Sequence, residues 1–151
     1  MELVTNTNSL EEHLPEFVIS DIAIEWDWVK LGVEEIISSQ ANIKNRPEDV
    51  YASCKTGESC LLTAGGNRFV VAQVIPNEFT QEKSFFIWLA WFAPEVRKAH
   101  TLSDYLGFFD DLARNAGCTQ LEAITTTKPL SRLYSSIGFE IEEITFVRKH
   151  Y

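Results

Sequence analysis

The chain has 151 residues, of which 45% are hydrophobic and 12% aromatic, and its formal net charge is −9. This size fits a single globular domain with a sizeable core, and two domains would be cramped. The acidic balance argues against nucleic acid and acidic membrane surfaces as partners, because both are bound through basic faces. The first residues lack the pattern of a secretory signal and no run of about 18 apolar residues occurs, so we expect a protein that is not secreted.

Three cysteines, Cys54, Cys60 and Cys118, give no signal for a disulfide or a metal site. Their number is odd, and no two of them have the Cys-x-x-Cys spacing that is typical of zinc ligands. We therefore expect reduced thiols with a structural role and no bound metal.

The first third of the chain predicts an arm followed by two helices. Residues 1–15 are polar and without pattern, which indicates a flexible arm or a weak first strand. In residues 26–40, apolar side chains recur every three or four positions, as on one face of an amphipathic helix. Asn45 as a cap and Pro47 in the first turn then indicate the start of a shorter helix that ends near Gly57.

The middle of the chain predicts a β-meander. The segments "SCLLTA" and "NRFVVAQVI" flank the turn-forming sequence Gly65-Gly66-Asn67, which is typical of a hairpin. Residues 84–92, "SFFIWLAWF", are apolar almost throughout, which indicates a strand that is buried on both faces. We expect its aromatic side chains to build the core; the other interpretation is an aromatic slot for an acceptor substrate.

The last third predicts a helix, a strand, a second helix and a final strand or hairpin. Residues 102–116 carry one continuous apolar stripe, and Gly117 follows as a stop. A strand over 119–126 leads to a short helix over 128–137, and 139–151 reads as two further strand segments. This order predicts a mixed α/β sheet with helices on both faces, in one domain.

The sequence "YSSIGF" at residues 134–139 resembles the Y-x-x-x-G-F pattern in the C-terminal part of the GCN5-related N-acetyltransferases (GNAT). The preceding elements follow the order of that family: a splayed central strand at 84–92, a cofactor helix from residue 102, then a strand and a late helix. The resemblance implies a GNAT-like fold with a central, mostly antiparallel twisted sheet. It also implies transfer of an acetyl group from acetyl-CoA to an amine.

The family holds the cofactor pyrophosphate on a Q/R-x-x-G-x-G/A loop between strand and helix, whose backbone N–H groups point at the phosphates. The corresponding residues here are Arg97, Lys98, Ala99, His100, Thr101 and Leu102. Arg97 matches the first position, but His100 and Leu102 replace both small residues. We expect their side chains to intrude on the phosphates or to require a positive φ. Arg97, Lys98 and His100 offer another way to hold an anion at a helix N-terminus, unless they are only a solvated basic loop.

Catalysis in the family uses a tyrosine as general acid for the leaving thiolate, and Tyr134 matches that position. The other interpretation is that Tyr134 packs on the sheet as a core residue. Family members often place a carboxylate on or near the central strand, whereas this strand has no ionisable residue. Glu122, on the next strand, is the first candidate for that role, and Glu95, just beyond the central strand, is the second.

The segments "GVEEI", "RPEDVYAS", "FVV" and "FFIWLAW" together resemble small acetyltransferase-like proteins of tailed bacteriophages. This resemblance implies a location in the cytoplasm of the bacterial host or in the virion. Trp26 and Trp28 are too close in sequence to share the inner face of one helix. We therefore expect one of them to face a partner or a second copy of the chain.

Two main functions stay open, with a binder of some other small anion as a lesser alternative, and the enzymatic status is undecided between the two. The first is a catalytically weak or inactive acetyltransferase-like phage protein that works by binding other proteins, in the virion or on a host target. The second is an active acetyl-CoA-dependent N-acyltransferase whose glycine-poor loop still holds the pyrophosphate.

Overall fold

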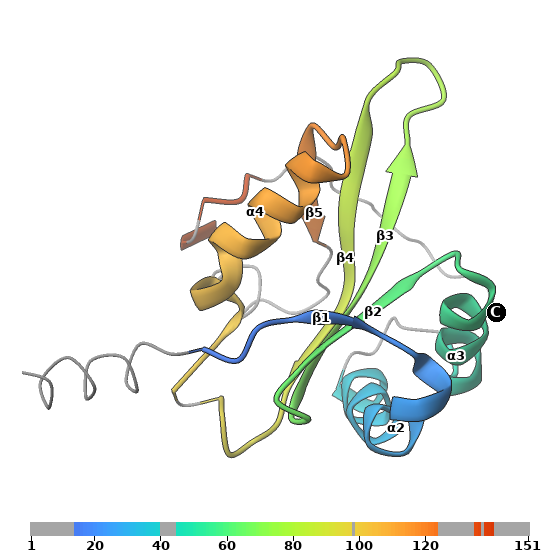
Figure 1. Ribbon diagram of the computed structural model, residues 1–151, viewed down its shortest axis with the longest axis vertical. Helices are drawn as coiled ribbons and strands as arrows, with labels where there is room; N and C mark the ends of the chain where they lie inside the picture. The colour runs from blue at the N-terminus through green and yellow to red at the C-terminus, as the bar shows by residue number, and fades with distance from the viewer. Residues whose placement is uncertain (1–13, 40–44, 98, 124–134, 137, 141–151) are drawn as a thin grey trace, which may run out of the picture.

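The computed structural model describes residues 14–39, 45–97, 99–123, 135–136 and 138–140. A five-stranded sheet forms its centre, with the strand order β1-β2-β3-β4-β5 (Figure 1). The strands are β1 (Val18–Ser20), β2 (Cys60–Ala64), β3 (Arg68–Pro76), β4 (Lys83–Phe92) and β5 (Gln120–Ala123). Neighbouring strands run antiparallel, except β4 and β5, which are parallel. The predicted mixed α/β fold is confirmed.

Helices cover both faces of the sheet (Figure 1). One face carries α2 (Ile22–Ser39) and α3 (Pro47–Thr56), and the other carries the 3-10 helix η1 (Leu102–Tyr105) and α4 (Leu106–Asn115). Because η1 and α4 cross from the end of β4 to the start of β5, these two strands can lie parallel.

Each face has its own apolar cluster. Phenylalanine and tyrosine rings dominate the α4 side, where Phe17, Tyr105 and Phe109 are buried against β3 and β4. On the α2/α3 side, Val29 and Val33 of α2 pack on Phe69 of β3. The sheet is therefore buried on both faces along its central strands, as the nearly continuous apolar sequence of β4 predicts.

Several predicted element ends are confirmed, and two are wrong. Gly57 ends α3 in the left-handed conformation with φ 84°, as predicted. However, α2 begins at Ile22, four residues before the start of the predicted helix, because Asp21 accepts a bond from the Ala23 amide through its carboxylate. The cap of α3 is Arg46 and not Asn45, since the Asp49 carboxylate accepts the Arg46 amide at 2.7 Å.

The first strand lies later in the chain than expected, at Val18–Ser20. Of the predicted arm, the structure describes only Leu14 and Pro15, and both contact the rest of the domain: Leu14 packs against the α4-side cluster and the Pro15 carbonyl accepts a hydrogen bond from Tyr105. Most of the predicted late helix and the segments after residue 140 lie outside the described residues.

Candidate functional site

A β-bulge at Trp88 changes which side chains of β4 face which helix layer. Val71 of β3 pairs with Leu89, but the next residue, Ala72, pairs with Ile87, so Trp88 is an inserted residue. Before the bulge Ile87 packs on the α4 side, and after it Leu89 packs on the α2/α3 side. A bulge bends its strand and increases its twist. The bulge therefore lies near the middle of β4, the strand that corresponds to the splayed strand of the family.

Beyond the bulge, β4 meets α2 through a close aromatic contact. Trp91 stacks on Phe69 with ring centroids 5.6 Å apart, and Trp28 of α2 lies edge-on to Phe69 at 5.9 Å. Gly32 of α2 sits directly on this pair, since a β-carbon there would lie 2.5 Å from the Phe69 ring and 2.7 Å from Trp91. The helix can approach the strand this closely only because the residue is glycine.

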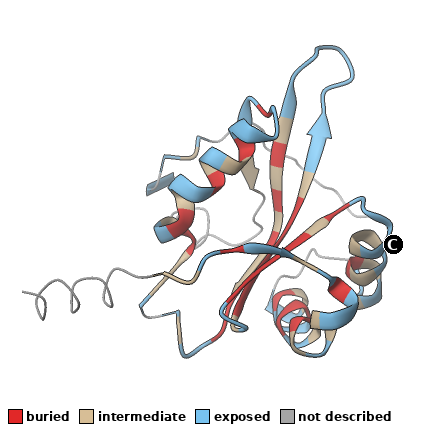
Figure 2. Ribbon diagram, in the orientation of Figure 1, coloured by how far each residue is buried: buried red, intermediate tan, exposed pale blue. Residues whose placement is uncertain are grey.

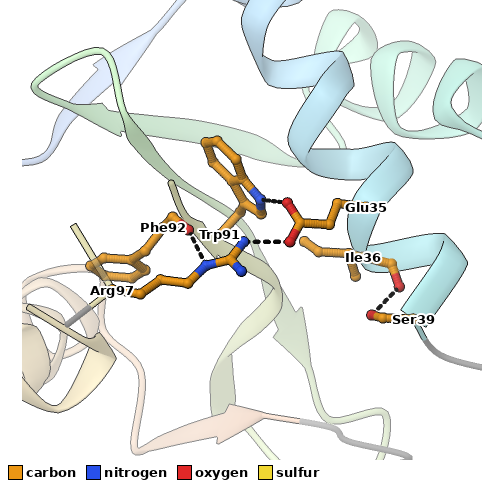
Figure 3. Close-up of polar contacts among 6 residues, drawn as sticks. All are labelled: Glu35, Ile36, Ser39, Trp91, Phe92 and Arg97. Carbon is orange, nitrogen blue, oxygen red and sulfur yellow. Dashed lines mark hydrogen bonds and ion pairs between the residues drawn. The ribbon is translucent and has the colours of Figure 1, made fainter. Parts of the chain in front are cut away.

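The same contact carries a polar cluster of three side chains (Figure 3). The Trp91 indole donates to Glu35 Oε2 at 2.7 Å, and Arg97 Nη2 pairs with Glu35 Oε1 at 2.5 Å. Arg97 also donates from Nε to the Phe92 carbonyl at 2.6 Å. Glu35 thus joins α2 to the end of β4 and to the loop that follows.

Glu35 is held as a carboxylate. The hydrogen bond from Trp91, then that from Arg97, lower the pKa of Glu35 below its ordinary value, and partial burial opposes this only in part. A carboxylate with a lowered pKa binds a proton weakly, so it is a poor general base near neutral pH.

The loop after β4 uses its backbone N–H groups internally. The Val96 and Arg97 amides donate to the Ala93 carbonyl, and the Ala99 and His100 amides donate to the Val96 carbonyl at 3.1 and 2.9 Å. These turns direct four amides into the chain itself. An anion-binding loop needs such groups to point outward.

A carboxylate of the chain already occupies the start of η1. The Thr101 amide donates to Asp104 Oδ2 at 2.7 Å, while the Asp104 amide donates to the Thr101 carbonyl at 3.0 Å. An acidic side chain at this position satisfies the helix N-terminus and complements its dipole. A phosphate approaching the same amide would meet a negative charge.

The described members of the predicted cofactor loop lie in the connection from β4 to the start of η1, but they do not point at a common place. Arg97 points to α2, His100 is half-buried, and Leu102 is buried in the α4-side cluster. The Leu102 side chain turns into the core and not toward the space before the loop. No described residue other than glycine has a positive φ. Lys98 lies outside the described residues.

Of the three candidate catalytic residues, Glu122 is separated from this loop, Glu95 lies in it, and Tyr134 lies outside the described part of the chain. Glu122 pairs with Phe86, six residues before Phe92 along β4, which is about 20 Å along a strand. Its carboxylate accepts bonds from Ser84 at 3.3 Å and Gln120 at 2.5 Å. Glu95 is exposed in the loop itself.

Both tryptophans of α2 pack inward, so the expected outward-facing one is wrong. Trp26 contacts Tyr51 of α3 at 5.1 Å, whereas Trp28 contacts Phe69 and Trp91 of the sheet. Because α2 packs against both the sheet and α3, it buries a wider arc than a helix with one neighbour. The exposed apolar residues of α2 are instead Ile24 and Leu31.

A buried arginine, Arg68, pairs with Phe92 at the C-terminal end of β4 and contacts η1 on the α4 side of the sheet. Arg68 is only 3% exposed, and it donates to the Tyr105 hydroxyl at 3.0 Å and to Asn67 Oδ1 at 3.1 Å. Tyr105 passes the chain of bonds on to the Pro15 carbonyl at 2.9 Å. No carboxylate among the described residues forms an ion pair with Arg68. The guanidinium is held by neutral oxygens and by the Phe92 ring, 5.9 Å away.

The residues that sequence reasoning missed are Glu35, Asp104 and Arg68. The cap formed by Asp104 could have been predicted, because Thr101 and Asp104 have the spacing of a capping box. Gly32, inside a helical pattern, also signals a close approach. Nothing in the sequence pairs Glu35 with Arg97, which is 62 positions away.

A shallow hollow of about 300 Å³ lies between α4 and β5. Its lining residues are Leu106, Asp110, Gln120, Leu121, Gly138, Phe139 and Glu140. The two carboxylates in this lining make the hollow unsuitable for phosphate groups.

All three cysteines are free thiols, and burial raises the pKa of Cys54 to about 11. Within the described residues, no group of three or more metal-ligating side chains comes together, and no helix is long and apolar enough to cross a membrane.

Comparisons of the whole chain with known proteins identify the fold. No family model and no curated protein matches the sequence. Among solved structures, a probable acetyltransferase matches 89% of this chain and 99% of its own, with a TM-score of 0.66 at 16% identity. The ribosomal-protein-alanine N-acetyltransferase of Brucella melitensis biovar Abortus 2308 matches 91% of this chain and 100% of its own, with a TM-score of 0.64 at 13% identity.

A third match is AAC(6')-Iy in complex with a bisubstrate analogue, CoA-S-monomethyl-acetylneamine. It covers 92% of this chain and 99% of its own, with a TM-score of 0.64 at 14% identity. At these identities the likeness establishes the fold, which is that of the GNAT acetyltransferases, and the predicted fold class is confirmed. Function must be argued from the site.

Proposed function

We propose that this chain is an acetyltransferase-like protein that acts through contacts with other proteins, with weak or no acetyl transfer of its own. The resemblance to small phage proteins suggests that such contacts are made in a virion or on a host target. One observation carries the proposal: in the loop after β4, the Arg97 guanidinium and four backbone amides all form hydrogen bonds within the chain.

The argument begins with Arg97, which matches the anion-binding position of the family loop. Its guanidinium donates to Glu35 and to the Phe92 carbonyl, and Glu35 is held in place by Trp91. A pyrophosphate at Arg97 would compete with Glu35 for the same guanidinium. It would also bring phosphate charge close to Glu35, whose lowered pKa keeps it a carboxylate.

Asp104 adds an electrostatic reason. Its carboxylate accepts the Thr101 amide at the start of η1, where the family resemblance implies a phosphate. A fixed negative charge within hydrogen-bond distance of that amide competes with the cofactor for the same donor and repels it.

An active acetyl-CoA-dependent N-acyltransferase is the second candidate, and one observation favours it. The bulge at Trp88 bends β4 just beyond the last described pair with β5, Ile87 with Ala123. A cofactor could insert where two strands diverge, and the matched AAC(6')-Iy is known in complex with CoA. In this case Arg97 and Lys98 would hold pyrophosphate and Tyr134 would protonate the thiolate.

Titration calorimetry with acetyl-CoA separates the two functions. The experiment compares the native protein with Arg97→Ala and with Arg114→Ala, a matched control whose arginine is exposed on α4 and pairs only with Asp111 among the described residues. The proposed function predicts no saturable heat up to millimolar cofactor in any of the three. Micromolar binding that Arg97→Ala weakens and Arg114→Ala leaves unchanged would establish the second candidate instead.

A further inference from the structure

The hairpin between β3 and β4 extends beyond the rest of the sheet (Figure 1). The last β2 pair on β3 is Cys60 with Ala72, and the first β5 pair on β4 is Ser84 with Gln120. Residues 74–83 are all exposed and form a two-stranded ribbon with its turn (Figure 2). No described strand or helix covers this ribbon, so it makes no contribution to the core.

The turn at the end of this ribbon, residues 77–82, is nevertheless well fixed by its own hydrogen bonds. Asn77 Oδ1 accepts the amides of Phe79 and Thr80 at 2.8 and 3.2 Å, and the Asn77 amide donates to the Glu82 carbonyl at 2.8 Å. The Glu82 amide donates to Thr80 Oγ1 at 3.1 Å. Side-chain bonds of this kind hold a turn in one conformation.

This fixed turn presents a large apolar side chain to solvent. Phe79 is 93% exposed, and Val74 and Ile75 on the ribbon are also exposed. By contrast, Phe69 and Phe109 in the body of the domain are fully buried. Phenylalanine on a preorganised frame loses little conformational entropy on binding, and aromatic side chains are typical anchors of protein interfaces.

The ribbon is poorly suited to binding by strand addition. Pro76 cannot donate a ladder hydrogen bond, and Lys83, its pairing partner, places a charge beside the same strand end. Proline and lysine on edge strands are devices that prevent pairing with another strand. The exposed Phe79 side chain is better suited to insertion into a cavity on a partner.

Charge limits the kind of partner. Glu78 and Glu82 flank Phe79 in the turn, and the whole chain has a net charge of −9. Nucleic acid and acidic membrane surfaces would be repelled, and so would a second copy with the same charge. A basic protein surface complements the turn.

We propose that the turn of residues 77–82 is a docking element, in which Phe79 enters an apolar socket on a partner protein and Glu78 and Glu82 pair with basic groups at the rim. The inference rests on the proposed function, since it names the surface through which protein contacts are made.

The test places the photo-crosslinking amino acid p-benzoylphenylalanine at position 79 and, in a second variant, at position 31. Leu31 is a matched control because it is also an exposed apolar residue, 65% exposed, but lies on α2. Both full-length variants are irradiated in the cells that produce the native protein. Any protein that is crosslinked from position 79 is then purified, and its affinity for the native chain, Phe79→Ser and the double variant Glu78→Gln/Glu82→Gln is measured.

The proposal predicts a basic partner that is crosslinked from position 79 and not from position 31. Phe79→Ser should weaken its binding at least about tenfold, and the double glutamine variant should slow association and reduce the salt dependence. Crosslinking to a second copy, to lipid or to nucleic acid would overturn the proposal, as would an affinity that Phe79→Ser leaves unchanged. Crosslinks from position 31 alone would reject the hairpin but keep the protein-contact function, and none from either position would count against both.

Discussion

The two ends of β4 differ in what they leave available to a ligand or partner. At its C-terminal end, Trp91 and the following loop are committed to internal bonds: Arg97 to Glu35 and Thr101 to Asp104. At its N-terminal end, a rigid turn exposes Phe79 to solvent. In the family this chain resembles, the C-terminal end is where the cofactor binds. The large apolar side chain that is most exposed on β4 and its turns therefore lies at the opposite end of the strand from the loop that the resemblance assigns to the cofactor.

Phe69→Ala should destabilise the protein more than the other substitutions below, because Phe69 is fully buried between Trp28 of α2 and Trp91 of β4. Replacing a buried phenylalanine by alanine lowers the free energy of unfolding by about 3–5 kcal/mol. Urea unfolding followed by tryptophan fluorescence measures this change. A loss below about 1 kcal/mol would mean that Phe69 does not pack tightly between Trp28 of α2 and Trp91 of β4.

Gly32→Ala should destabilise the protein, although the same change in an exposed helix normally stabilises by about 1 kcal/mol. The added β-carbon would lie 2.5 Å from the Phe69 ring, and overpacking of this kind typically costs about 1–3 kcal/mol. Gly107→Ala is the matched control, because Gly107 is also helical but a β-carbon there meets no atom within 4 Å. Equal stabilisation by both changes would contradict the close approach of α2 to β4.

Glu35→Gln should lower the free energy of unfolding modestly, by about 0.2–1 kcal/mol, because the pair with Arg97 is about half exposed. The pKa of Glu35 is lowered in the folded state, so its contribution is complete above the ordinary value of 4.5 and is lost as the pH falls through the lowered value. Native and variant proteins should therefore differ at pH 7 and converge in acid. Glu34→Gln, which removes only a 3.9 Å contact with Lys30, is the control and should show a smaller difference at pH 7.

Phe79→Ala should have the smallest effect, within about 0.5 kcal/mol, because the side chain is 93% exposed. The comparison with Phe69→Ala uses the same chemical change at the two ends of the hairpin strands. A loss of more than about 1 kcal/mol would show that Phe79 packs on the domain, and the docking element would then lose its basis.

The sequence predicted those parts of the fold that rest on local patterns. The Gly65-Gly66 hairpin, the Gly57 helix stop and the apolar β4 follow from turn chemistry and periodicity, and all three are confirmed. The bulge at Trp88 was not predictable, because an inserted residue leaves an all-apolar strand looking the same. The inward packing of Trp26 depends on Tyr51 of α3, a contact that the periodicity of α2 alone does not predict.

For the candidate site, the sequence predicted where the loop lies in the chain but not where its side chains point. The described residues among 97–102 lie in the connection from the end of β4 to the start of η1. The direction of the Arg97 side chain depends on Glu35, and that of Leu102 on the α4-side cluster, and both are long-range contacts. The helix cap by Asp104 is local and was therefore within reach of sequence reasoning.

The internal use of the loop after β4 can be tested directly by an NMR titration of the ¹⁵N-labelled protein with acetyl-CoA. The signals to follow are the amides of Ala99, His100 and Thr101 and the indole N–H of Trp91, which reports on Glu35. If these groups are committed as the structure indicates, none of the four signals should shift in a saturable way up to millimolar cofactor. Saturating shifts of the loop amides at micromolar cofactor, together with a shift of the Trp91 indole as Arg97 leaves Glu35, would contradict it.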